Sequence, residues 1–252
     1  MGTHQVAFEK WALSHTGYEG GDLSEGGIWF CGIEWGGAYK CIDHFLQDLD
    51  LGPREDIPFI NDANPNLPEK EPFTRILFAL YRNLNAVRLM GSAEVVSDVK
   101  GHMFTKDSKT LKLNLFPVAQ RRVDAKHWEP FAAITGLNTK REYWKWCVEK
   151  RFPGFREMVR TGSPSLIICT GHSYAREYLQ AFGNACLDPS MPTRSTVVCS
   201  GTRNHPAYFY RGEVTSVFVV PFFGVPFFGG LEKMELTTAS LAKWMIQCLD
   251  AK

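Results

Sequence analysis

The chain lacks most of the features that assign a protein to a class at first sight. It has no uninterrupted run of about 18 apolar residues, so we expect no membrane-spanning helix and no membrane partner. Its N-terminal residues contain no apolar core of a signal peptide. The formal net charge is +1, which excludes a global basic excess but leaves room for a local basic patch. We therefore expect an ordinary globular protein of the cytoplasm.

The cysteines also lack a pattern. There are seven of them, an odd number, and no two form a C-x-x-C pair. Cys31, Cys169 and Cys199 lie in strand-like apolar runs. The His, Asp and Glu residues show no recognisable zinc spacing. We therefore expect buried reduced thiols, no metal and no other cofactor.

What the chain does contain is an alternation of strand-like and helix-like segments. This alternation predicts an α/β protein with a three-layer α/β/α fold and a mostly parallel central sheet, in a single domain over residues 1–252. Closely spaced prolines predict an irregular insertion at about 51–72. Residues 18–27 and His205 are expected in loops, and Pro153 and Gly154 are expected to kink a helix. The expected strands are 28–33, 111–117, 166–170, 196–200, and a hairpin of 208–210 with 214–220. The expected helices are 4–16, one whose apolar face includes Tyr39 to Leu46, 73–85, 141–160, 173–182 and 236–249.

Several of the expected strands end in polar or glycine-rich turns. Gly32, Ile33 and Glu34 follow the first central strand, Asn114 closes the next, and His172 follows the strand 166–170. In an open α/β sheet the turns at the carboxyl ends of the strands line the ligand crevice. These turns are therefore the candidate functional site.

The order of these segments resembles the uracil-DNA glycosylase superfamily over about residues 27–249. Gly32-Ile33-Glu34-Trp35-Gly36 resembles the first motif of its bacterial branches, with Glu34 at an Asn position. Glu71-Pro72-Phe73 resembles the Arg-Pro-Phe that opens a helix, and Leu113-Asn114-Leu115-Phe116 resembles the strand that ends in a base-reading Asn. Cys169 to Ala175 and Val217 to Gly224 fall where two further motifs are expected.

The resemblance implies a monofunctional DNA glycosylase of the bacterial cytosol or nucleoid. Such an enzyme binds a flipped deaminated or modified base and hydrolyses its N-glycosidic bond. Glu34 would position water or stabilise the cationic transition state. Asn114 and the backbone near Gly32 and Ile33 would read the base, and Phe73 would stack on it.

One departure from the family pattern bears on the chemistry. The resemblance places a His or Asn near residue 222, where this chain has Phe222, which cannot donate a hydrogen bond to the leaving base. His172 is the candidate replacement because histidine carries protons near neutral pH. Cys147 matches one ligand position of the iron–sulfur branches, but the remaining ligand cysteines are missing, so no cluster is expected. The residues expected to contact DNA are Lys112, Arg121 and Arg122 at phosphates and Phe227 and Phe228 as an apolar wedge.

Other interpretations stay open. The chain could be a catalytically inactive protein that binds a nucleic acid or nucleobase, or a small-molecule hydrolase that uses Glu34 and His172. Each site residue also has a structural role open to it: Glu34 in a helix cap or surface ion pair, Asn114 in a turn and Phe73 in the core. The expected partner is single- or double-stranded DNA, bound by a monomer.

Overall fold

The computed structural model describes most of the chain. The described residues are 3–23, 26–34, 39, 41–57, 72–88, 103–106, 108–120, 128–183, 192–200, 203–213, 215–222 and 231–251. Seven strands form one sheet in the order β1-β3-β2-β4-β7-β6-β5. The four central strands β3, β2, β4 and β7 run parallel to one another, while β1, β6 and β5 are antiparallel to their neighbours. The strands are β1 (Tyr18–Gly21), β2 (Ile28–Gly32), β3 (Thr110–Asn114), β4 (Leu166–Thr170), β5 (Arg194–Ser200), β6 (Arg203–Arg211) and β7 (Ser216–Val220).

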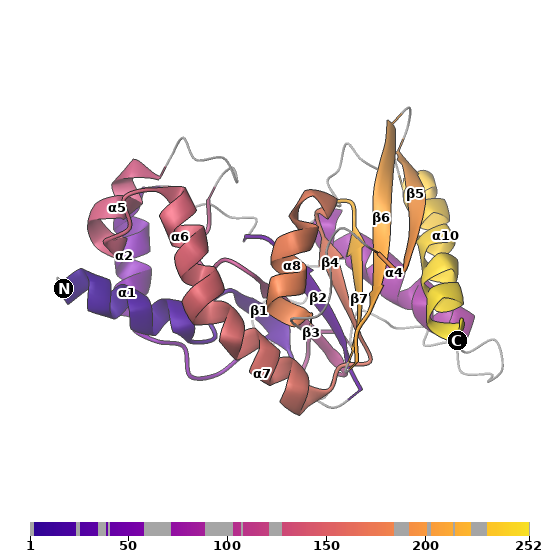
Figure 1. The fold of residues 1–252 in the computed structure, drawn as a ribbon, viewed down its shortest axis with the longest axis horizontal. Coiled ribbons are helices and arrows are strands. Elements are labelled where there is room, and N and C mark those ends of the chain that lie inside the picture. The colour runs from indigo at the N-terminus through magenta and orange to yellow at the C-terminus, as the bar shows by residue number, and fades with distance from the viewer. Residues whose placement is uncertain are drawn as a thin grey trace.

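Helices cover both faces of the sheet, and each face has its own hydrophobic cluster. In Figure 1, α10 and α4 lie together at one end of the molecule, while α1, α2, α5 and α6 gather at the other end. The chain is therefore a mixed α/β protein in which the sheet is the middle layer, as the sequence predicts. One face carries α1 (Thr3–Leu13), α2 (Ile42–Asp50), α5 (Glu129–Thr135), α6 (Lys140–Trp146), the π-helical turn η2 (Cys147–Arg151), α7 (Phe152–Gly162), η3 (His172–Tyr174) and α8 (Ala175–Phe182); the other carries α4 (Pro72–Arg88) and α10 (Leu231–Asp250).

The central strands are apolar along their whole length because both of their faces are covered. Trp29 and Cys31 of β2 belong to the cluster under α1 and α7, and Ile28 and Phe30 to the cluster under α4 and α10. All four side chains are buried, and burying one large apolar side chain stabilises a fold by about 1.5–3 kcal/mol. This explains why β2, β4 and β7 are recognisable as continuous apolar runs.

The order of the parallel strands defines where a ligand crevice belongs. β3 follows β2 in the chain and lies on one side of it, whereas β4 lies on its other side and is followed outward by β7. The chain therefore leaves β2 toward one edge of the sheet, to β3, and leaves β4 toward the opposite edge, on the side of β7. Ligands of open α/β sheets bind at the carboxyl ends of the strands at such a topological switch point. Here these ends carry Gly32 to Glu34 and Gly171 to His172.

Three local predictions were wrong. Residues 18–21 form the edge strand β1 instead of a loop, and the register shift between Tyr18 and Gly20 makes Glu19 a bulge. β6 begins at Arg203, before its apolar residues, so His205 lies within the strand, opposite Val198. The helix over 141–160 is not one regular α-helix, because the π-helical turn Cys147–Arg151 interrupts it just before Pro153.

The proline-rich insertion is described only at its beginning and end. Residues 51–57 contain neither helix nor strand, Pro72 already belongs to α4, and 58–71 lie outside the described residues. Among the helices that the structure describes, none has the length and hydropathy needed to cross a bilayer.

Candidate functional site

Glu34 is buried directly after β2, at the switch point of the sheet. Its side chain is 3% exposed, and its Oε1 lies 2.9 Å from Nζ of Lys140, whose side chain is 2% exposed. Lys140 also donates a hydrogen bond to Oε1 of Gln120. A buried charge is tolerated only when it is paired and hydrogen-bonded. The ion pair therefore explains how a carboxylate and an ammonium group can both be buried here.

The start of α6 places Lys140 against Glu34. Thr139 is the N-cap, and its Oγ1 accepts a 3.1 Å hydrogen bond from the backbone N–H of Glu142. Lys140 is the first residue of the helix, where the partial positive charge of the helix terminus disfavours a cation. Burial disfavours it further. Glu34 is the anion that compensates for both effects.

The carboxyl group of Glu34 has an altered acidity. Burial raises its pKa from 4.5 to about 7, and the attraction of Lys140 opposes this increase. A carboxyl group with a pKa near neutral pH can exchange a proton under physiological conditions. This is the property expected of a general acid or base, although buried structural ion pairs also perturb pKa values.

Several buried polar atoms around Glu34 lack partners. Apart from the contact with Lys140, the two carboxyl oxygens accept no hydrogen bond from any described residue. Within the same described part of the chain, Nε2 of Gln120 and Nε1 of Trp144 also have no acceptor. Buried polar groups are normally hydrogen-bonded, so each exception calls for an explanation such as a ligand or a catalytic role. The cluster combines proton acceptors with unused donors.

Aromatic rings surround this polar cluster. The ammonium group of Lys140 lies 5.7 Å from the centroid of the Trp144 ring. That ring stacks on Phe116 at 5.4 Å and meets Tyr174 edge-on at 6.1 Å. Tyr174 belongs to η3, which follows β4, so the rings connect α6 to the second strand of the switch point. The aromatic surroundings lower the local dielectric and strengthen the pairing of Glu34 with Lys140.

Asn114 lies in β3, directly beside Gly32 of β2. Its position requires that residue 32 have no side chain. A Cβ atom added to Gly32 would lie 2.4 Å from Oδ1 of Asn114. Nδ2 of Asn114 donates to the carbonyl oxygen of Gly17 at 3.2 Å and to Oε1 of Glu19 at 2.5 Å. Both amide hydrogens are therefore engaged, and Oδ1 is the acceptor directed over Gly32. The backbone of Ile33, in turn, holds β3 in place by accepting from the N–H of Phe116.

Lys112 and Phe73 belong to the same set of contacts as Asn114. Lys112 shares the carboxylate of Glu19 with Asn114, and Phe73 contacts Lys112. Nζ of Lys112 lies 2.5 Å from Oε2 of Glu19, and the side chain of Lys112 is 7% exposed. The same ammonium group lies 5.5 Å from the centroid of the Phe73 ring, which stacks on Phe222 at 5.8 Å. The bulge at Glu19 directs one carboxylate toward both Lys112 and Asn114. Lys112 is thus placed inward, in an ion pair, rather than on an open surface.

His172 lies at the end of β4, as the sequence predicts. It begins η3, is half-buried, and its ring centroid lies 6.0 Å from that of His205 in β6. Burial lowers the pKa of His172, and the nearby His205 lowers it further. His172 is therefore mainly neutral at pH 7, which suits a proton acceptor better than a permanent cation.

The structure groups the expected site residues into two sets. Glu34 faces α6, whereas Asn114, Lys112, Phe73 and Phe222 gather on the α4 side of the sheet. Gly32 lies between the sets, since its added Cβ would be 3.9 Å from the carbonyl oxygen of Glu34 and 2.4 Å from Asn114. No contact among the described residues joins the two side chains of Glu34 and Asn114. Arg121, Arg122, Phe227 and Phe228 lie outside the described residues.

Four residues of the site were missed by the sequence analysis. They are Lys140, Gln120 and Trp144 around Glu34, and Glu19 beside Asn114. No motif marks any of them, and each acts through a partner remote in the chain. In the described part of the chain, no group of three or more His, Cys, Asp or Glu residues is arranged to hold a metal ion.

Comparison with known proteins gives no assignment. No family model and no curated protein matches the chain. The function therefore has to be argued from the site.

Proposed function

We propose that the protein is a DNA glycosylase-like hydrolase that acts on a flipped, deaminated or modified base. The observation that carries the proposal is the buried Glu34 carboxyl group at the switch point, with a pKa of about 7 and oxygens that accept nothing from the described residues but the contact with Lys140. The motif order that surrounds Glu34 in the sequence supports the choice of substrate.

The reaction needs one water molecule and no other co-reactant. Water attacks C1′ of the deoxyribose as the bond between C1′ and the base nitrogen breaks, and the bonding electrons leave with the base. Glu34 in its ionised form takes a proton from the water, and its negative charge stabilises the oxocarbenium-like transition state. The departing base takes up a proton from solvent, and the mainly neutral His172 can donate a hydrogen bond to it through the ring N–H. The products are free base and an abasic sugar.

The base would be held on the Asn114 side of Gly32. Oδ1 of Asn114 lies directly over Gly32, which has no side chain, and Phe73 offers an aromatic face beside Lys112, two residues before Asn114 in β3. A base carbonyl could replace Glu19 as the acceptor for the amide of Asn114. Stacking on Phe73 would contribute about 1–3 kcal/mol, provided that the base displaces Phe222 from that ring.

Release of free base from uracil-containing single- and double-stranded DNA tests the proposal. Glu34→Gln should abolish release, whereas Glu149→Gln, at an exposed position on the helical segment that carries Lys140, should leave it unchanged. Because Glu34 acts in its ionised form, the rate should rise with pH and level off above about 7. Absence of product from every deaminated base at high protein concentration would reject the enzyme.

A second function, base or nucleic-acid binding without chemistry, is favoured by one observation. Phe222 is 61% exposed and stacks on Phe73 where the resemblance calls for a hydrogen-bond donor. Loss of one such donor costs about 2.7–4 kcal/mol of transition-state stabilisation. A binding protein would retain salt-sensitive DNA binding in both wild type and Glu34→Gln, with no product from either. In an enzyme, Phe222→His should instead increase the rate of base release.

A further inference from the structure

The two edges of the sheet differ in how they are protected. β1 has four residues, a bulge at Glu19 and positive φ angles at Gly20 and Gly21. β5 has seven residues in unbroken register with β6 and contains no proline, lysine or acidic residue. Proteins normally blunt a free edge with such devices, because unpaired backbone groups attract another strand. β1 is blunted in this way, and β5, the last described strand on its side, is not.

The register with β6 shows which backbone groups of β5 face outward. Val197 lies opposite Pro206, which has no N–H. Antiparallel partners alternate between pairs that exchange two hydrogen bonds and pairs that exchange none, so Val197 and Pro206 form a pair of the second kind. The N–H and C=O groups of Val197 therefore point away from β6, toward the free edge. The same alternation applies to Ser195 and Cys199, two residues away on either side.

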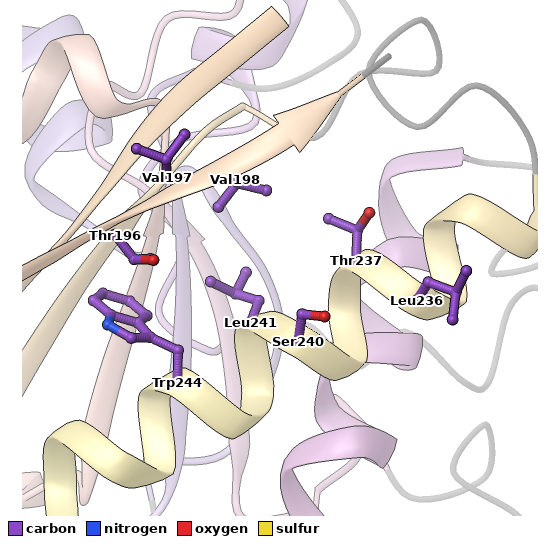
Figure 2. A pocket seen from close by; sticks show the side chains of 8 residues that line it. All are labelled: Thr196, Val197, Val198, Leu236, Thr237, Ser240, Leu241 and Trp244. Carbon is purple, nitrogen blue, oxygen red and sulfur yellow. The ribbon is translucent and has the colours of Figure 1, made fainter. Parts of the chain in front are cut away.

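An uncharged groove runs beside this edge. A cavity of about 290 Å³ lies between β5 and α10. Figure 2 shows its lining side chains, with Thr196 and Trp244 at one end and Leu236 at the other. None of its lining side chains is charged. Val197 is 57% exposed and Leu236 65%, and both are large apolar side chains. Within the described part of the chain, apolar surface and backbone groups without a neighbouring strand thus occur together.

We propose that β5 pairs antiparallel with β5 of a second copy of this chain, with Val197 on the two-fold axis. The strand is self-complementary in this register. Val197 meets Val197, Ser195 meets Cys199, and the outward backbone groups of these residues form about six hydrogen bonds. Arg194 meets Ser200 at each end, which holds the two arginine side chains about 20 Å apart and avoids repulsion between them. The sheet then continues through both protomers, and this isologous contact closes as a dimer.

The register also fixes the contacts on the α10 side of the sheet. Thr196 of one protomer lies opposite Val198 of the other, as a pair without hydrogen bonds between their backbones. Side chains are closest in such pairs, with a Cα separation of about 4.5 Å. This separation falls within the range of about 4.4–6.8 Å that a disulfide spans. The proposal can therefore be tested residue by residue.

The first experiment is light scattering of the full chain over about 1–100 µM. Wild type should change from monomer to dimer, and Val197→Lys should be monomeric over the whole range because two ammonium groups would meet on the axis. Leu51→Lys, at an 82% exposed position elsewhere, should dimerise like wild type. A wild type that stays monomeric, or a dimer that survives Val197→Lys, overturns the proposal.

Oxidative cross-linking gives the register independently of that variant. A mixture of Thr196→Cys and Val198→Cys protomers should form a disulfide-linked heterodimer. Neither variant alone, nor wild type with its native cysteines, should cross-link above background. Equal cross-linking in the separate variants, or none in the mixture, overturns the proposed register. Neither experiment depends on DNA or on base release, so the dimer and the proposed function stand or fall separately.

Discussion

Oε1 of Glu34 and Nζ of Lys140 lie 2.9 Å apart, and their two side chains are buried almost completely. Each charge would be unstable at its position without the other, Glu34 because of burial and Lys140 because of burial at a helix N-terminus. The pair is therefore the most consequential contact at the switch point. It fixes both the position and the acidity of the only candidate general base that the sequence predicts at β2.

Lys140→Met should raise the pKa of Glu34 above its value of about 7, since the opposing attraction of the ammonium group is removed while burial remains. A carbon-13 titration of the Glu carboxyl signals, assigned with Glu34→Gln, measures this directly. Lys145→Met is the matched control, because Lys145 lies on the same helix, is 76% exposed and forms an ion pair with Glu149 at 3.7 Å. An unchanged Glu34 titration in Lys140→Met would show that the ion pair has no influence on its acidity.

Glu34 should also make the stability depend on pH. Its pKa is about 7 in the folded protein and 4.5 without burial, so between these values the folded protein binds more protons than the unfolded chain. The stability contributed by the protonated carboxyl group is fully present below pH 4.5 and decreases as the pH rises to 7, by up to about 1.4 kcal/mol per pH unit. Urea unfolding of wild type and Glu34→Gln at several pH values tests this. The difference in the free energy of unfolding should follow this slope, and a difference independent of pH would contradict it.

Gly32→Ala should displace the side chain of Asn114 or destabilise the fold by about 1–3 kcal/mol, since the new methyl group would lie 2.4 Å from Oδ1. The midpoint of urea unfolding should fall, and so should the DNA binding that the proposed function requires. Gly154→Ala provides the control. It lies within α7 with no heavy atom within 4 Å of the added Cβ, and it should leave the midpoint unchanged or raise it slightly.

Arg151 is a buried cation that stabilises backbone carbonyl groups. Its Nε donates to the carbonyl oxygen of Leu115 at 3.1 Å, and its terminal nitrogens donate to those of Ala12, Ser14 and Thr16. Arg151→Met would remove these donors and should cost about 3–5 kcal/mol of unfolding free energy. Arg160→Met, which disrupts an exposed pair with Glu157, should leave the free energy of unfolding nearly unchanged. Similar losses in the two variants would show that the buried donors are unimportant.

The central part of the fold could be predicted from the sequence because its signal is local. β2, β4 and β7 are buried on both faces, so each is a continuous apolar run. The amphipathic pattern that predicts a helix over 73–85 corresponds to α4. β1 was missed because its Tyr-Glu-Gly-Gly sequence is typical of a turn, and only pairing with β3 makes it a strand. In β6, the pair His205-Pro206 suggested a loop, but the missing N–H of Pro206 faces away from β5 and leaves the ladder intact.

The candidate site could be predicted only in part, for a related reason. Strand-end geometry correctly placed Glu34 and His172 after their strands and Asn114 at the end of its own. The partners of these residues depend on contacts over long sequence distances. Lys140 follows Glu34 after more than a hundred residues, and Glu19 precedes Asn114 by 95. Spacing within a motif carries no information on such pairs, so neither the burial of Lys112 nor the raised pKa of Glu34 could be predicted.

The π-helical turn over Cys147–Arg151 sets the rotational phase between two halves of one long helical segment. The first half must direct Lys140 to Glu34, while Arg151 must point at carbonyl groups in the last turn of α1 and just after it. Each residue of an α-helix turns the chain by about 100°, and the wider π turn absorbs a residue that a regular helix has no room for. Deleting one residue between Cys147 and Arg151 would turn the guanidinium group of Arg151 away from the carbonyl groups that it binds, while Lys140 stayed in place. The length of this turn is therefore fixed by two distant contacts, and a shortened helix could satisfy only one of them.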